Sequence, residues 1–301
     1  MRSKTAQQTS VQSAPSKPIF SGHESFQCRH LWLKKGYDYV KKKKSFNNED
    51  SVVSLGVGKN MVSSIRFWMK SFNLLTADDK LTDFAHQIFA DNGFDPYLED
   101  EATIWLLHYH LVKKGYASTY SILFNELRKE KVEFTKDNFV GLIKRKAESD
   151  KYYQVNEKTL LDDFAVFTKM YLRSETQTKD KEDSFTGILT ELDLIKTFSR
   201  GKEDFYVIEL TERNEIPDDI VLYAILDNEV FESSINITSI EMNINSVGSI
   251  FAINRSGLIT KIENLTKKYS YIVYKDQAGV KELQFKKKPL ATSILEKYYA
   301  N

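Results

Sequence analysis

The residues best suited to acid–base or metal chemistry gather in the first part of the chain, where all five histidines lie within the first 110 of 301 residues. One candidate catalytic pair is His23 and Glu24, because a glycine-flanked loop leaves side chains free to face a ligand. A second candidate is the acidic run that starts at Asp95 and includes Glu99. Histidines, carboxylates and carboxylate-held metals are the groups that hydrolyse phosphodiesters.

Each candidate site also has a structural explanation. Acidic residues at the start of a helix stabilise it by about 0.3–1 kcal/mol each without any metal, and His23 with Glu24 could cap or staple the following helix. His108 and His110 stand about 200° apart around a helix and so cannot share a ligand. With Cys28 as the single cysteine, zinc is disfavoured. The metal stays unknown, and magnesium or manganese is expected only if the chain cuts DNA.

A second kind of chemistry, nucleic-acid recognition, is indicated by the stretch LGVGKNMVSSIRFWMK, residues 55–70. It is not a Walker A phosphate loop, because Val53 and Asn60 replace the required glycine and hydroxyl. It fits a helix-turn-helix, in which Gly56 takes the positive φ that ends the first helix. The alternatives are an ordinary helical hairpin with a solvated polar face, or a protein-binding module. The candidate DNA-binding residues are Arg29, Lys59, Asn60, Ser63, Ser64, Arg66 and Lys70.

The charge distribution agrees with a polyanionic partner near the start of the chain. Residues 1–80 hold 14 Lys and Arg against 6 Asp and Glu, whereas residues 81–301 hold 29 against 36. The net charge of +1 therefore conceals a basic first part. A lysine-rich tail and loop that are merely solvated would give the same count.

The composition divides the chain into two domains. Residues 174–184, SETQTKDKEDS, have no apolar side chain and are expected to form a linker. We predict a disordered tail over 1–18, a helical DNA-binding domain over 19–173 and a small α+β domain over 185–301. We find no internal repeat, membrane span or signal peptide, so we expect a cytoplasmic protein.

Hydrophobic periodicity predicts a fold that is mainly α, or α+β overall. Helices are expected over 30–44, 48–54, 59–72, 95–115, 120–130, 135–147 and 157–172, with Trp68 and Trp105 in the core. In the second domain we expect a helix over 185–197, a strand over 204–210 and a helix over 216–230. Two helices around residues 254–257 and a hairpin over 269–285 follow. This order of helix, turn, helix and hairpin is that of a winged helix, and many other small α+β domains share it.

Four segments resemble a known family: FSGHESFQCRHLWLKKGYDYV (20–40), LGVGKNMVSSIRFW (55–68), FDPYLEDEATIWLLHYHL (94–111) and PLATSILEKYY (289–299). They resemble the bacterial domain-of-unknown-function family four thousand and seven, which includes SspB-like proteins of DNA phosphorothioation systems. The resemblance implies contact with DNA and nicking of DNA so that sulfur can be installed. It implies as partners a cysteine desulfurase, a PAPS-reductase-like ATP-using sulfur transferase and an NTPase. It does not identify the residues that cut.

Three functions therefore compete. The first is a DNA-binding component of a sulfur-modification phage defence system, with DNA nicking as its activity. The second is a non-enzymatic adaptor that recruits modification enzymes to DNA. The third is a winged-helix transcriptional regulator, which would usually be shorter or carry an evident effector domain. A homodimer is compatible with each of the three.

Overall fold

The computed structural model describes residues 17–173, 186–277 and 279–300. The predicted linker, residues 174–184, lies outside the described residues. The predicted tail also lies outside them, apart from Lys17 and Pro18.

Helices make up most of the described chain, as the periodicity predicted. Before the predicted linker they are α1 (Trp32–Lys41), α2 (Ser51–Leu55), α3 (Lys59–Ser71), α4 (Asp83–Phe89), α5 (Glu101–Lys114), α6 (Ser118–Ile122), the π-helical turn η1 (Leu123–Leu127), α7 (Arg128–Glu130), α8 (Lys136–Ser149), η2 (Lys151–Tyr153) and α9 (Glu157–Tyr171). After it they are η3 (Thr190–Leu192), α10 (Asp218–Leu226), α11 (Ile237–Met242), α12 (Val247–Ile250), α13 (Arg255–Lys268) and α14 (Thr292–Tyr299).

Two antiparallel sheets of three strands complete the described fold, which is therefore mixed α and β. The strands are β1 (Glu133–Phe134), β2 (Ile195–Arg200), β3 (Glu203–Ile208), β4 (Ser234–Asn236), β5 (Ile272–Gln277) and β6 (Val280–Phe285). The sheet orders are β1-β3-β2 and β4-β6-β5. In both sheets a short strand precedes the helices and pairs with the last strand of a later hairpin. The pairing of β1 with β3 joins chain segments that lie on either side of residues 174–184.

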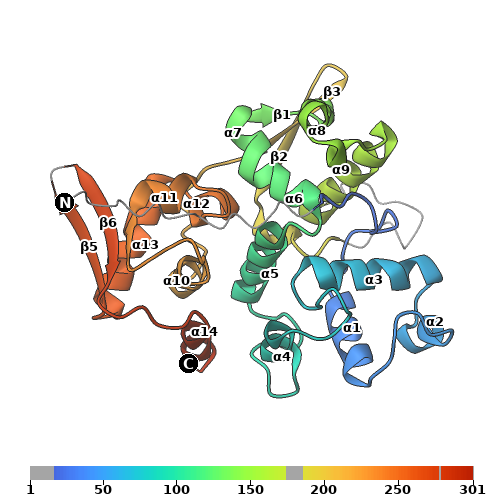
Figure 1. The fold of residues 1–301 in the computed structure, drawn as a ribbon, viewed down its shortest axis with the longest axis horizontal. Coiled ribbons are helices and arrows are strands. Elements are labelled where there is room, and N and C mark those ends of the chain that lie inside the picture. Colours follow the sequence, from blue (N-terminus) through green and yellow to red (C-terminus); the bar gives the residue numbers. More distant parts are fainter. Residues whose placement is uncertain (1–16, 174–185, 278, 301) are drawn as a thin grey trace, which may run out of the picture.

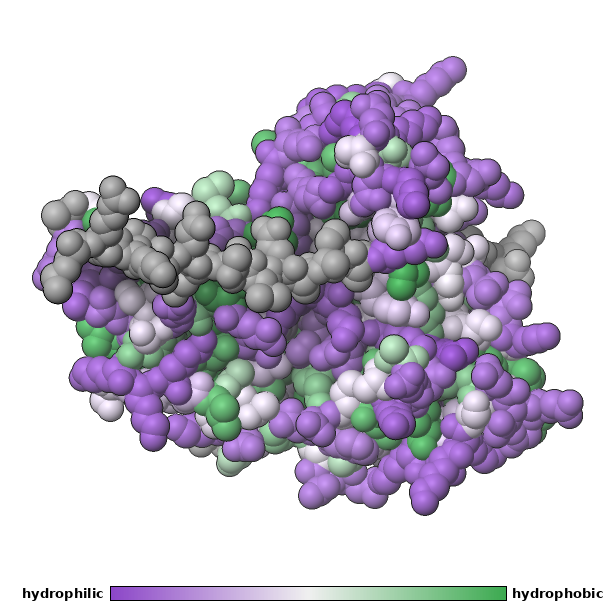
Figure 2. All heavy atoms as spheres, viewed as in Figure 1, coloured by the Kyte–Doolittle hydropathy of each residue, from purple (hydrophilic) through white to green (hydrophobic). Residues whose placement is uncertain are grey.

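Three lobes surround the central helix α5 (Figure 1). The helical lobe contains α1–α4, the first sheet lobe contains α6–α9 with β1–β3, and the second sheet lobe contains α10–α14 with β4–β6. Helix α5 contacts α3, α6, α10 and α12, and so touches all three lobes. Figure 2 shows that hydrophilic side chains cover much of the surface seen from this side.

The sequence of α5 explains its central place. Asp100 caps its start by accepting the amide of Ala102 at 2.9 Å, and Gly115 ends it with φ of +62°. Every residue from Ala102 to Val112 is buried. A helix that is apolar on all sides must be covered on all sides. The acidic start and the glycine end that the sequence predicted for this helix are both confirmed.

The two histidines of α5 connect it to other elements. His108 Nε2 lies 2.8 Å from the carbonyl oxygen of Ile250, and Nδ1 lies 2.8 Å from the Tyr171 hydroxyl. Because a carbonyl only accepts, Nε2 carries the proton and Nδ1 accepts from the tyrosine. His110 contacts the Tyr223 hydroxyl at 3.0 Å. The two rings therefore bind different helices, in agreement with the prediction that they share no ligand.

The two predicted core tryptophans are confirmed. Trp68 and Trp105 are both fully buried, and Trp68 Nε1–H donates to the carbonyl of Phe26 at 3.0 Å. This bond ties α3 to the loop that precedes α1.

The helix predicted over 185–197 is wrong. The described part of this segment is a single 3-10 turn, η3, followed by strand β2, which pairs with β3 along its whole length. Tertiary pairing with a neighbouring strand outweighs weak local helix propensity. The hairpin predicted over 269–285 is confirmed as β5 and β6. None of the described helices has the length and apolar character that crossing a membrane requires.

We expect stability to fall in mild acid because of the buried histidines. Burial lowers the pKa of His108 to about 3 and that of His110 to about 4. The unfolded chain takes up these protons as the pH falls through about 6.5. The stability that comes from keeping both histidines neutral is therefore fully present above that pH. It is lost between about 6.5 and 3, at up to about 1.4 kcal/mol per pH unit for each histidine.

The measurement is urea unfolding at several pH values for the wild type and for His108→Gln. The variant should be less stable near neutral pH and should depend less steeply on pH. An equally steep dependence would contradict the assignment to His108.

Candidate nucleic-acid interface

The stretch predicted to form a helix-turn-helix contains two helices, α2 and α3, with a turn between them. Helix α2 ends at Leu55, and Gly56 follows with φ of +64°. A Cβ at this position would meet no atom within 4 Å, so the backbone angle rather than space favours glycine. Gly58 caps α3 in an extended conformation. The positive φ predicted for Gly56 is confirmed.

The two faces of α3 differ as the periodicity predicted. The apolar face is buried against the core through Val62, Ile65, Trp68 and Met69, and Ser64 is buried with it. Lys59, Asn60 and Ser63 are exposed on the other side. The side chain of Lys59 has no hydrogen bond or ion pair within the described part of the chain. These three side chains form the outer face at the start of α3.

Arg66 and Lys70 are held by an acid. The Arg66 guanidinium donates to both carboxylate oxygens of Asp79, at 3.0 and 2.5 Å, and Lys70 Nζ lies 2.9 Å from Oδ1. Burial acts to raise the pKa of Asp79, but hydrogen bonds from the two cations outweigh it and lower that pKa. Part of the positive charge is thus neutralised within the protein. Arg29 lies over the ring of Trp32, 5.1 Å from its centre.

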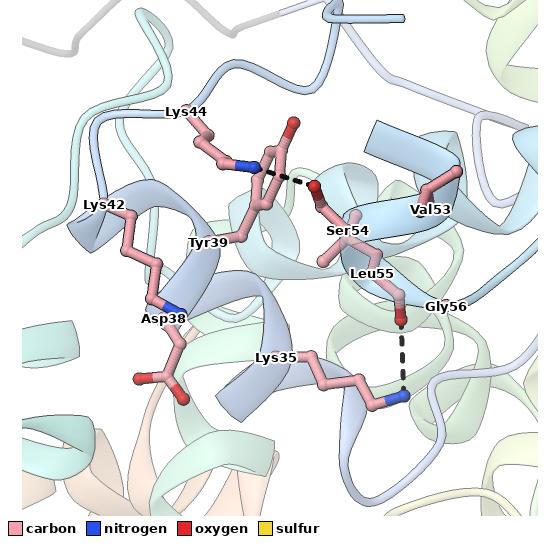
Figure 3. Close-up of a pocket in the computed structure, with 9 residues that line it drawn as sticks. All are labelled: Lys35, Asp38, Tyr39, Lys42, Lys44, Val53, Ser54, Leu55 and Gly56. Atoms are coloured by element: carbon pink, nitrogen blue, oxygen red, sulfur yellow. Dashed lines mark hydrogen bonds between the residues drawn. The ribbon is translucent and has the colours of Figure 1, made fainter. Parts of the chain in front are cut away.

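A pocket of about 480 Å³ lies between α1 and α2, next to the turn into α3 (Figure 3). We call it the lysine pocket. The residues that line it are Lys35, Asp38, Tyr39, Lys42, Lys44, Val53, Ser54, Leu55 and Gly56.

The lysine pocket carries positive charge that is only partly compensated. Lys44 Nζ bonds the Ser54 hydroxyl and the Asp50 carboxylate, each at 2.8 Å. Lys42 is exposed and has no side-chain partner among the described residues. Asp38, the acid in the lining, pairs with Lys34 at 2.7 Å. The sequence reasoning missed this pocket because it treated residues 41–50 as a connection, although four consecutive lysines after a helix are a recognisable signal.

The first predicted catalytic pair is divided between the interior and the surface. His23 is buried, its Nε2 lies 2.9 Å from Asp163 Oδ1, and its Nδ1 accepts the amide of Ser25 at 3.2 Å. Its ring also stacks on Trp68 at 6.0 Å between centres. Glu24 is exposed. Both nitrogens of His23 are therefore engaged within the protein, and the catalytic role of the pair stays a prediction.

Asp163 holds the loop that carries His23. Its carboxylate also accepts the amide of Ser21 at 2.7 Å and the hydroxyl of Thr119 at 2.8 Å. One buried carboxylate on α9 thus joins this loop to α6. Gly22 has φ of +95°, and a Cβ there would lie 2.7 Å from the Phe67 ring. The loop is closely fitted to its neighbours.

The second predicted catalytic pair is divided in the same way. Asp95 is buried and accepts the amides of Glu99 and Asp100 at 2.8 and 3.0 Å. It therefore stabilises the turn before α5, whereas Glu99 is exposed. The catalytic role of this pair also stays a prediction. Within the described residues, no three or more His, Cys, Asp or Glu side chains are grouped to hold a metal ion.

Comparisons with known proteins agree with this architecture. The model of the family described as a protein of unknown function, DUF4007, matches residues 20–299. The chain belongs to the DUF4007 family. Similar solved structures are a magnesium ion-bound SspB crystal structure, with TM-score 0.83, and an SspB crystal structure, with TM-score 0.82. Each is 26% identical, and the match covers 94% of this chain and 88% of that chain. No curated protein matches this DUF4007 chain.

We expect Asp163→Ala to destabilise the protein by at least about 2 kcal/mol. It leaves the buried donors on His23 and Thr119 unsatisfied, at about 1–3 kcal/mol each, and removes the acceptor of the Ser21 amide. Asp162→Ala is the matched control, because Asp162 is exposed on the same helix and should change stability by less than about 0.5 kcal/mol. Urea unfolding near neutral pH measures both, and equal effects would contradict the role of Asp163.

Proposed function

We propose that this DUF4007 protein is a DNA-binding component of a bacterial DNA phosphorothioation system. The observation that carries the proposal is the exposed polar start of α3 beside the lysine pocket. The similarity to SspB supports the choice of system, because SspB-like proteins belong to phosphorothioation systems. The same proposal includes a role in phage defence through sulfur modification of DNA. It also includes a location in the cytoplasm.

The contact with DNA follows from the geometry of α3. Backbone amides at a helix start and the helix dipole both favour a phosphate there. Lys59 adds an ammonium group, while Asn60 and Ser63 can donate to phosphates or base edges. Lys35 and Lys42 in the lysine pocket would contact neighbouring phosphates. Arg66 and Lys70 can contribute to DNA binding by contacting a phosphate while they stay paired with Asp79.

We also propose that the second sheet lobe is a winged-helix-like unit. The succession of α10, β4, α11–α13, β5 and β6, with the sheet order β4-β6-β5, supports this. The first sheet lobe has the same succession and order. The division into domains at 19–173 and 185–301 stays a proposal, beside the observation that β1 and β3 pair across it.

DNA nicking is the activity that the family resemblance supports. Of the four candidate catalytic residues, Glu24 and Glu99 have exposed carboxylates, whereas His23 and Asp95 are engaged in holding loops. One of the similar SspB structures is magnesium ion-bound. The described residues of this chain show no grouped side chains that fit a resident metal ion, so we derive no step through one.

The second candidate function is the non-enzymatic adaptor. The structural hydrogen bonds of His23 and Asp95 favour it, because these bonds account for both residues without catalysis. In this case the protein would bring the cysteine desulfurase, the ATP-using sulfur transferase and the NTPase to DNA. The transcriptional regulator ranks third.

We expect Lys59→Ala and Lys42→Ala each to weaken DNA binding and to reduce its salt dependence. Each lost phosphate contact lowers the slope of log K against log salt by about 0.9. The matched control is Lys41→Ala, because Lys41 precedes Lys42 in the chain but pairs with Asp91 at 2.9 Å. Fluorescence anisotropy with a labelled duplex gives both quantities. Unchanged slopes for Lys59→Ala and Lys42→Ala in folded protein would refute this interface.

If the protein nicks DNA, Glu24→Gln or Glu99→Gln should reduce the rate by about 100-fold or more while DNA binding persists. Both side chains are exposed, so the substitutions should leave the fold intact. The assay is nicking of supercoiled plasmid with magnesium or manganese. Wild-type nicking by both variants would place the chemistry elsewhere, and a wild type that never nicks would favour the adaptor.

A further inference from the structure

The last part of the chain has a charge opposite to that of the segment before it. Residues 255–301 hold ten Lys and Arg against four Asp and Glu. Residues 81–254 hold 19 against 32. The chain is therefore basic at both ends and acidic between them. The net negative charge of residues 81–301 therefore conceals the basic segment over residues 255–301.

The structure brings lysines from three separate elements together. The amide of Lys286 donates to the carbonyl of Tyr271 at 2.9 Å, and its Nζ donates to Ser270 at 3.1 Å. These bonds place Lys286, the first of three consecutive lysines, beside the end of α13. Lys268 and Lys297 lie 5.6 and 5.4 Å from the ring centre of Tyr269. We define the lysine cluster as Lys267, Lys268, Lys286, Lys287, Lys288 and Lys297.

For five of these lysines, all except Lys297, carboxylates of the described residues neutralise little of the charge. Asp219, which is 4% exposed, pairs with Lys268 at 2.5 Å and accepts the Tyr269 hydroxyl. Lys286 and Lys288 donate to backbone carbonyl oxygens, which carry no net charge. The exposed side chains of Lys267 and Lys287 bond no described residue.

The local fold accounts for only part of the cluster. Lys267 and Lys268 stand in the last turn of α13, where cations stabilise the helix dipole. Lys286, Lys287 and Lys288 follow β6, and Lys297 belongs to α14, so the dipole of α13 does not explain their presence. The end of α13, the end of β6 and helix α14 thus contribute lysines to one basic surface. An external anion would neutralise this charge.

We infer that the lysine cluster binds the phosphate backbone of DNA as a second contact, separate from α3. Lysines bind phosphates as point charges and gain affinity by releasing counterions. The half-buried ring of Tyr271, whose centre lies 5.3 Å from that of Tyr269, adds a flat surface beside the charges. This inference rests on the proposed DNA binding. The cluster belongs to elements on the left of Figure 1, whereas α3 lies on the right. A bound duplex would therefore run along the molecule.

The test is the double variant Lys267→Ala, Lys287→Ala. The matched control is Lys136→Ala, Lys158→Ala, which removes the same charge from exposed lysines in the first sheet lobe. Duplex binding is titrated by fluorescence anisotropy over a range of salt concentrations, and thermal unfolding checks the fold. We expect the slope of log K against log salt to fall by about 1.8 for the cluster variant. The control should keep the wild-type slope.

The other possible outcomes of this experiment also decide whether the lysine cluster binds DNA. An unchanged slope for the cluster variant, with a reduced slope for Lys59→Ala, overturns the inference and leaves the proposed function standing. Equal losses in the cluster variant and in the control overturn it as a general effect of charge. A reduced slope for the cluster variant alone supports the inference and refutes the contact at α3.

Discussion

The fold depends on a neutral histidine buried in the central helix. His108 donates to the carbonyl of Ile250 in the second sheet lobe and accepts from Tyr171 in the first sheet lobe. Burial lowers the pKa of His108 to about 3, so the ring is neutral near pH 7 and carries its proton on the Nε2 that donates to the carbonyl. An unpaired polar group at that depth costs about 1–3 kcal/mol. A single side chain therefore specifies how two lobes meet on α5.

A buried arginine strengthens the same junction. Arg128 donates to the carbonyls of Phe124, Gly248 and Ser249. Desolvation by burial lowers its pKa to about 10, so the guanidinium stays charged at neutral pH. Gly248 and Ser249 belong to the short helix α12, so their carbonyls place this cation where the dipole of that helix is negative. Together with His108 it holds the two sheet lobes in one arrangement.

In the helical lobe, buried contacts hold in place the helix α3 that carries the polar surface. Trp68 anchors α3 to the loop at Phe26, and the stacked ring of His23 is held in turn by Asp163. These buried bonds leave the outer face of α3 and the lysine pocket with few internal partners. Residues whose hydrogen bonds are satisfied inside the protein support the surface, and residues without internal partners are the ones that the proposed contact with DNA would use.

The sequence by itself determined most helices, the turn between α2 and α3, and the β5–β6 hairpin. These features depend on local signals: apolar spacing in α3, the positive φ of Gly56, and β-branched runs around a turn. The outer residues Lys59, Asn60 and Ser63 follow from the same spacing. The family could also be recognised, because its motifs are continuous stretches of sequence.

Only the tertiary structure decided features that join distant segments. Strands β1 and β4 have two and three residues, too few to show a pattern, so the shared succession of the two sheet lobes is invisible in the sequence. The burial of His23 depends on Asp163, which lies 140 residues away in the chain. The lysine cluster likewise requires β6 to end beside α13. Burial and charge convergence depend on which segments pack together, and no local pattern of residues encodes that.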